Sequence, residues 1–166
     1  MEEQAAARRL LEHELGTMYG AEHRLAETLS KMIGDAGEPK LVSALETHKA
    51  VTQRQIERLG GVFDMLRAKP SRGISEGYEG LMDQLSNFLN AREKISSAEL
   101  DLCIASTVMR VQYYEIASYK YLIPLSNQAN LNRAAIALYD SLTEERDASN
   151  AMERMLVEAL LPKLMT

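Results

Sequence analysis

The sequence predicts an all-α fold, in which four long helices form a bundle and a shorter helix lies in the central connection. Two observations favour this fold. Apolar residues recur at steps of three and four over long stretches, and the few prolines and glycines fall mostly between those stretches. The chain of 166 residues is long enough to bury a core of its own, so we expect a single domain over 1–166.

The first predicted helix spans about residues 4–33, and its apolar stripe contains one carboxylate. The stripe consists of Leu11, Leu15, Met18, Glu22, Leu25, Leu29 and Met32. A lone buried carboxylate destabilises a fold by several kcal/mol unless another group pairs with it. Glu22 therefore requires a partner. Gly34, Gly37 and Pro39 interrupt the pattern and end this helix.

The second predicted helix spans about residues 40–67 and ends before the breaker run at 69–73. Its stripe consists of Leu41, Leu45, His48, Thr52, Gln55 and Leu59. A short helix is expected within residues 74–94, where LMDQLSNFLNAR follows two early glycines.

The third and fourth long helices are predicted at about 97–128 and 132–161. The stripe of the third consists of Leu102, Ala105, Met109, Gln112, Ile116 and Tyr119, beside a flanking row of Ile104, Val108, Val111, Glu115 and Leu122. The stripe of the fourth consists of Leu138, Leu142, Glu145, Ser149, Met152 and Leu156. Pro124 and the polar run after it close the third helix, and Asn130 or Asn132 is expected to cap the fourth. Two tight hairpins joined by a longer crossover are the plan of a ferritin-like four-helix bundle.

Each long helix carries a polar interruption near its middle. If these positions lie at one level, Glu22, His48, Glu115 and Glu145 converge on the bundle axis. Three carboxylates in an apolar interior repel one another, so they stay ionised only beside cations or else take up protons. One or two divalent metal ions would satisfy them, and carboxylates with an imidazole suit Fe or Mn, with Zn a weaker candidate. Taken singly, such residues more often make buried hydrogen bonds that fix helix register, so a metal-free centre stays open. Of the adjacent Glu144 and Glu145, one is expected to be solvated.

The remaining residues that could carry chemistry are expected to have ordinary roles. His13 and His23 flank the first stripe and are expected at the surface, and Cys103 is expected to be a small buried residue. Tyrosines gather on the last two helices, with packing or interface roles expected and redox relays as the alternative: Tyr113, Tyr114, Tyr119, Tyr121 and Tyr139. The sequence contains no phosphate loop, Ser/His/Asp arrangement or zinc-type cysteine pair, and we assign no catalytic residue.

The charge and composition exclude several classes of partner. The net charge of −5 and the lack of a basic cluster argue against nucleic acid and anionic membranes. No segment approaches the roughly 18 apolar residues of a membrane span, and the N-terminus does not resemble a signal peptide. A single cysteine fits a reduced compartment, so we expect a cytoplasmic protein.

At these residues the chain resembles the YciE/YciF-like family of ferritin-like bacterial proteins. The resemblance covers most of the chain and is carried by ELGTMYGAEHRLAETLSKM, ETHKAVTQRQIERLGGVF, VQYYEIASYKYL and SLTEERDASNAMERM. It implies a ferritin-like fold, commonly a homodimer, an association with stress responses and an interior that can hold a di-metal site. Glu22, Glu115 and Glu145 keep the acidic residues of the family pattern.

The chain also departs from that pattern at four positions. Gln112 stands where the family usually has Glu, Tyr113 where it has His, Val51 where it has an acidic residue and Ser149 where it has Asp. Each departure removes a strong ligand, so a single-metal or a metal-free centre stands beside a two-metal site.

Two functions therefore follow from the sequence. One is a stress-associated metalloprotein that reacts with O₂ or peroxide. The other is a non-catalytic helical dimer with a vestigial polar centre that acts through protein–protein interaction. Enzymatic activity and substrate stay open.

Overall fold

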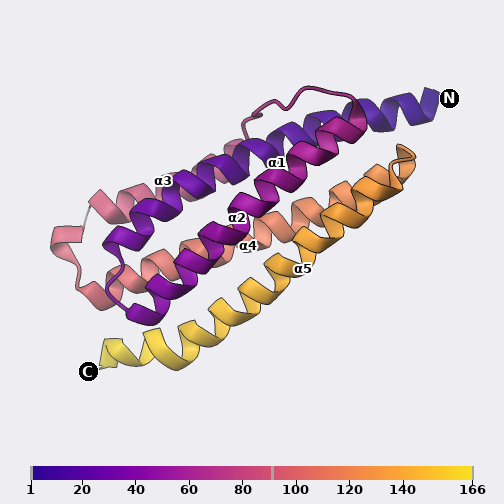
Figure 1. The fold of residues 1–166 in the computed structure, drawn as a ribbon. Coiled ribbons are helices and arrows are strands. Elements are labelled where there is room, and N and C mark those ends of the chain that lie inside the picture. Colours follow the sequence, from indigo (N-terminus) through magenta and orange to yellow (C-terminus); the bar gives the residue numbers. More distant parts are fainter. Residues whose placement is uncertain (1, 91, 166) are drawn as a thin grey trace.

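The computed structural model describes residues 2–90 and 92–165, which form helices joined by short connections (Figure 1). The helices are α1 (Glu2–Asp35), α2 (Pro39–Leu66), α3 (Glu76–Asn90), η1 (Arg92–Lys94), α4 (Ser97–Gln128), α5 (Asn132–Met155), η2 (Leu156–Leu160) and η3 (Leu161–Met165). The predicted four-helix bundle with an extra helix in its crossover is confirmed. Met1, Ala91 and Thr166 of the predicted domain lie outside the described residues.

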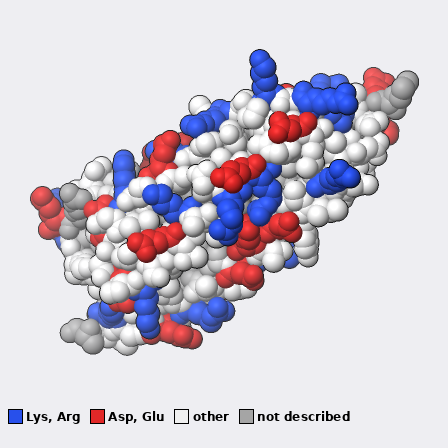
Figure 2. Space-filling view, in the orientation of Figure 1, with Lys and Arg blue, Asp and Glu red and all other residues white. Residues whose placement is uncertain are grey.

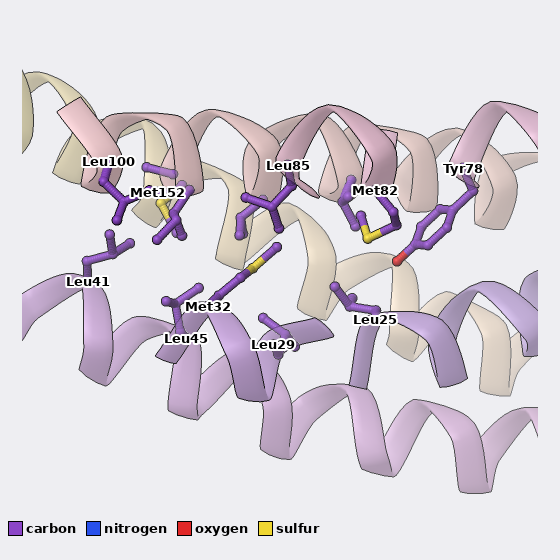
Figure 3. Close-up of a cluster of buried hydrophobic side chains, with 14 of the residues drawn as sticks. Leu25, Leu29, Met32, Leu41, Leu45, Tyr78, Met82, Leu85, Leu100 and Met152 are labelled. Carbon is purple, nitrogen blue, oxygen red and sulfur yellow. The ribbon is translucent and has the colours of Figure 1, made fainter. Parts of the chain in front are cut away.

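The four long helices pack as two hairpins, α1 with α2 and α4 with α5 (Figure 1). In addition α1 packs on α4 and α2 on α5, so the order around the bundle is α1, α2, α5, α4. The crossover helix α3 packs on α4. Its apolar residues Tyr78, Met82 and Leu85 share one buried cluster with Leu25 and Leu29 of α1 (Figure 3). The crossover helix therefore extends the core and covers one side of the bundle.

Local signals fix where α2 and α4 begin. The side chain of Glu38 accepts a hydrogen bond from the Lys40 N–H at 3.3 Å, and Pro39 occupies the first turn of α2. A reciprocal capping box between Ser96 and Glu99 starts α4. These interactions satisfy backbone N–H groups that have no partner within the first turn of a helix.

The start of α5 differs from the prediction. It follows Leu131 without a side-chain cap, so the expected cap at Asn130 or Asn132 is wrong. Asn130 adopts a φ of 58° just after α4, and Asn132 is already the first residue of α5. Asparagine tolerates the left-handed conformation better than most residues, so Asn130 serves the turn between the two helices.

The last helix is also shorter than predicted, because regular α-helical spacing ends at Met155. The chain widens into the π-helical η2, where the N–H of Leu161 donates to the carbonyl of Leu156 five residues earlier. It then tightens into the 3₁₀-helical η3. Pro162 lacks an N–H and its ring would clash with the carbonyl four residues before it, which accounts for the loss of the α-helical pattern at this end.

The buried residues of α4 favour the flanking row over the predicted main stripe. Ile104, Val108 and Val111 are fully buried, whereas Leu102 and Met109 are half-buried. The reason is that α4 contacts α1, α3 and α5, so its most buried face points to where those helices converge. The predicted stripes of α1 and α2 are buried throughout.

The apolar core divides into two clusters. One includes Leu25, Leu29, Leu41, Leu45 and Met152, and the other includes Leu15, Leu59, Phe63, Leu138 and Leu142. On each long helix the polar interruption lies between residues of the two clusters. The bundle therefore has a polar layer between two apolar layers.

The connection between α2 and α3 lies directly against α1 at three glycines. The N–H of Gly73 donates to the carbonyl of Gly16 at 2.8 Å. A Cβ on Gly20 would lie only 2.0 Å from the carbonyl oxygen of Gly73. This close backbone contact fixes where the chain enters α3 and thus where Tyr78 reaches the core.

No helix within residues 2–90 and 92–165 is long and apolar enough to cross a membrane. On the face drawn in Figure 2, basic and acidic side chains are interspersed.

Replacing Gly20 with Ala should destabilise the protein, because the new methyl group meets the Gly73 backbone and the connection has to move. We expect a loss of about 1–3 kcal/mol in the free energy of unfolding, measured by urea denaturation. Gly60→Ala is the matched control, since a Cβ there meets no atom within 4 Å and should stabilise α2 by about 0.5–1 kcal/mol. Equal effects of the two substitutions would contradict the proposed close contact.

Candidate metal centre

Three of the four predicted site residues meet in the polar layer. His48 of α2, Glu115 of α4 and Glu145 of α5 each offer a ligand atom, and these atoms all lie within 4.8 Å of one another. The distance from His48 Nε2 to Glu145 Oε2 is 3.8 Å. All three residues are buried, and both carboxylates are completely so. This spacing is compatible with one ion held between the three side chains.

Most ligand atoms of this group have no hydrogen-bond donor or acceptor to satisfy them. Within the part of the chain that the structure describes, no N–H or O–H group donates to either oxygen of Glu115 or to Oε2 of Glu145. Neither ring nitrogen of His48 has a hydrogen-bond partner. Because ionised carboxylates only accept hydrogen bonds, Glu115 and Glu145 cannot satisfy each other without a proton. Such buried polar atoms require a proton, a water molecule or a cation.

The electrostatics of Glu115 and His48 also favour uncharged side chains in the absence of a cation. Burial, followed by repulsion from Glu22 and Glu145, raises the pKa of Glu115 well above its usual range. Burial also lowers the pKa of the His48 imidazole, against an opposing effect of Glu145. Without a cation, Glu115 is therefore driven toward its protonated form and His48 toward its neutral form.

Glu22 is buried in the same layer but lies outside the group of three. Its Oε1 accepts a hydrogen bond from the Tyr119 hydroxyl at 2.7 Å, and its Oε2 has no hydrogen-bond partner. Burial and the charge of Glu145 raise the pKa of Glu22, and the Tyr119 hydrogen bond opposes them. The partner that this carboxylate required is thus a tyrosine, one of the residues for which a packing role was expected.

A second set of polar residues holds Glu145 in place. The side-chain amide of Gln55 donates to Glu145 Oε1 at 2.9 Å and to Glu144 Oε2 at 3.2 Å. Arg58 in turn makes a two-pronged ion pair with Glu144, at 2.9 and 3.1 Å, and donates to Ser141. Glu144 is the more exposed of the two adjacent glutamates, as expected, but it is ion-paired and half-buried.

Tyr78 of α3 belongs to the centre, although the sequence pattern does not predict it. Its hydroxyl points into the core (Figure 3) and has no hydrogen-bond partner among the described residues. Burial and the charges of Glu115, Glu22 and Glu145 raise the pKa of Tyr78 well above its usual range. The recurrence of apolar residues at Tyr78, Met82 and Leu85 marks the inner face of α3. It does not show that α3 reaches the polar layer.

The other candidate residues lie away from the three ligand atoms. His13 is exposed as predicted, whereas His23 is half-buried with its ring against Tyr19. Cys103 is half-buried, so the prediction of a buried cysteine holds only in part. Tyr113 is exposed and hydrogen-bonds Glu153.

The structure also shows where three residues that differ from the expected family pattern lie. Gln112 is buried beside the centre with its Oε1 unpartnered, and Val51 is half-buried. The hydroxyl of Ser149 donates to the Arg146 carbonyl within its own helix. These residues contribute no charged ligand.

The raised pKa of Glu115 gives the metal-free protein a defined pH dependence. A carboxyl whose pKa is higher in the folded state binds protons more tightly there, so its contribution to stability is complete below its unfolded pKa of about 4.3 and is lost as pH rises. In chelator-treated protein, wild type should therefore lose stability relative to Glu115→Gln between pH 5 and 8, measured by urea denaturation.

Glu144→Gln is the control for this experiment. Its ion pair with Arg58 lowers the pKa of Glu144 against the effect of burial. Glu144 therefore changes the stability of the protein only below about pH 4.3. The stability difference between Glu144→Gln and wild type should stay constant from pH 5 to 8. If the stability difference between wild type and Glu115→Gln also stayed constant from pH 5 to 8, the proposed protonation of Glu115 would be contradicted.

Comparison with known proteins supports the fold. The chain is 31% identical to YciF of Escherichia coli over 137 residues, which covers 81% of this chain and 80% of that protein. The crystal structure of the E. coli stress protein YciF matches with a TM-score of 0.84 at 27% identity, covering 91% of this chain and 94% of that one. YcfI from Rhodopseudomonas palustris matches with a TM-score of 0.83 at 33% identity, covering 89% and 92%.

The family assignment covers nearly the whole chain. Residues 6–164 match the model of a family described as a domain of unknown function, DUF892. Together with the identity to YciF, this match confirms the resemblance to the YciE/YciF-like family. The chain therefore belongs to the DUF892 family and is a YciF-like helical-bundle protein.

Proposed function

We propose that this protein binds a redox-active divalent metal ion in the centre of its bundle and acts in stress defence. The observation that carries the proposal is the meeting of His48, Glu115 and Glu145 within 4.8 Å, in a buried layer where most of their ligand atoms have no hydrogen-bond partner. The second support is the relative YciF, which is described as a stress protein of E. coli.

The residues present fit an ion of iron or manganese. One imidazole and two carboxylates are a donor set that both metals favour, and zinc accepts it too. Glu22 lies outside the group of three but is buried in the same layer, and its Oε2 has no hydrogen-bond partner among the described residues, so we propose it as a fourth ligand. A cation would also relieve the repulsion that raises the pKa of Glu22 and Glu115. One ion is favoured over two, because Gln112, Val51 and Ser149 supply no charge.

The surrounding residues have separable roles in such a site. Gln55 and the Arg58–Glu144 pair orient Glu145, and Tyr119 orients Glu22. Residues that orient metal ligands in this way commonly change metal affinity by about 10- to 100-fold. The leucines and methionines of the two apolar clusters limit access of water. Iron or manganese would supply the electrons for reaction with peroxide or O₂. The compartment that we propose for the protein is the reduced cytoplasm.

Metal content tests this proposal directly. Protein purified without a metal-affinity tag and incubated anaerobically with Fe(II) or Mn(II) should hold about one ion per chain. His48→Ala and Glu145→Ala should each remove most of it, because each loses a ligand. Inductively coupled plasma mass spectrometry gives the ratio of metal to protein, and circular dichroism verifies that each variant is helical.

Exposed residues of α1 provide the matched controls. His13→Ala and Glu12→Ala remove the same chemical groups from the surface and should leave the metal content unchanged. The metal proposal would be refuted if wild type held less than about a tenth of an equivalent of metal after incubation with Fe(II) and also after incubation with Mn(II).

A second candidate function is a helical homodimer that acts through protein contacts. The observation that favours it is an apolar patch across α4 and α5, formed by Ile123, Ile136 and Tyr139. Ile136 is 66% exposed and Tyr139 is 55% exposed. Large apolar side chains grouped on a surface often mark an interface. The two functions are compatible, since the patch does not involve the metal ligands.

The dimer can be tested by mutating the patch. Wild type should sediment as a particle of twice 18.6 kDa, and Ile136→Glu should convert it to a monomer because a buried charge would lie in the interface. Ile74→Glu is the control, since Ile74 is an even more exposed isoleucine outside the patch. Sedimentation equilibrium measures the mass, and a monomeric wild type at micromolar concentration would rule this interface out.

A further inference from the structure

A cavity of about 170 Å³ opens beside the centre, between α2, α4 and α5. Its walls include Val51, Ala148, Met152 and Met155. Thr47 and Ala151 are exposed and form the mouth, whereas His48 and Gln112 are buried and form the floor. The cavity exists because alanines and a valine occupy positions where longer side chains would fill the space.

The floor of the cavity has polar atoms that lack partners, although its walls are largely apolar. His48 is 4% exposed and neither ring nitrogen is hydrogen-bonded. Gln112 is 1% exposed and its Oε1 accepts no hydrogen bond. Buried polar atoms in folded proteins are nearly always satisfied by protein, water or ligand. Two such groups at the end of an apolar cavity therefore indicate a ligand with one polar end.

We propose that this cavity binds a small, largely apolar organic molecule that carries one hydroxyl group. A hydroxyl is both donor and acceptor, so it can donate to Gln112 Oε1 and accept from a ring N–H of His48. An imidazole has at least one N–H in either of its protonation states, so the match does not depend on pH. The apolar body of the ligand packs against Val51, Met152 and Met155.

The size of the cavity and the chemistry of its walls favour such a ligand over water alone. An engineered apolar cavity of about 150 Å³ binds benzene, so the space here accommodates a six-membered ring. A water molecule could satisfy the floor, but further waters along the alanine and methionine walls would find too few hydrogen-bond partners. The proposed ligand therefore has one polar end and an apolar body about the size of one six-membered ring.

This site shares His48 with the proposed metal centre, but it is otherwise a different set of residues. Glu115 and Glu145 do not line the cavity. Binding of the organic molecule therefore does not rest on the metal proposal. Either proposal can fail without the other.

Phenol is the probe that tests the cavity. Titration of phenol into the chelator-treated full-length chain, followed by ¹H–¹³C methyl NMR, should show saturable shifts at Met152 and Met155. Ala148→Leu fills the cavity and should weaken phenol binding by at least about tenfold. Ala137→Leu is the matched control, because Ala137 is a half-buried alanine of α5 outside the cavity, and it should leave the affinity unchanged.

The polar end is tested separately with Gln112→Met, which keeps the length of the side chain and removes the acceptor. Phenol affinity should fall by about threefold to tenfold, the value of one hydrogen bond, while the affinity for benzene stays the same or rises. Glu145→Gln should retain phenol binding even if it loses metal, which separates the two sites. Absence of saturable phenol shifts in wild type, or equal affinities for wild type and a folded Ala148→Leu variant, would overturn the proposal.

Discussion

The burial of Glu22, Glu115 and Glu145 in one layer of the bundle is the constraint that shapes the rest of this molecule. All three side chains are inaccessible to solvent. Among the described residues no lysine or arginine is buried with them, and the nearby Arg58 is already paired with Glu144. Carboxylates in such surroundings must be protonated, hydrogen-bonded or bound to a cation. The neighbouring side chains meet only part of this requirement, because Tyr119 and Gln55 satisfy one oxygen each.

Apolar layers on both sides enclose that centre. Each long helix places leucines or other apolar residues before and after its polar position, so slipping one helix by a turn would put a carboxylate among leucines. The polar residues thus specify the register of the bundle even without metal. The crossover adds a further side to the same enclosure, since contacts among Gly16, Gly20 and Gly73 place α3 so that Tyr78 faces the carboxylates.

Uncharged residues border one side of the centre. Gln112 and Val51 line a cavity that opens onto His48. A neutral amide and an aliphatic side chain cannot balance the charge of a second metal ion. They can contact an uncharged organic molecule. The residues that favour one metal ion in our proposal are thus also the ones that would contact the proposed organic ligand.

The sequence by itself determined the helices and the polar positions, because both are written in local periodicity. A carboxylate within a leucine stripe identifies Glu22 as buried, and the same spacing marks His48 and Glu145. Glu115 lay in the row beside the predicted stripe, and only the packing of α4 against three helices decided that this row is the most buried. Tertiary structure also decided which carboxylates meet, since the relative heights of helices far apart in sequence depend on their packing. For the same reason the contact of Tyr119 with Glu22, the approach of Tyr78 and the cavity beside His48 follow from neighbours in space, which no periodicity in the chain records.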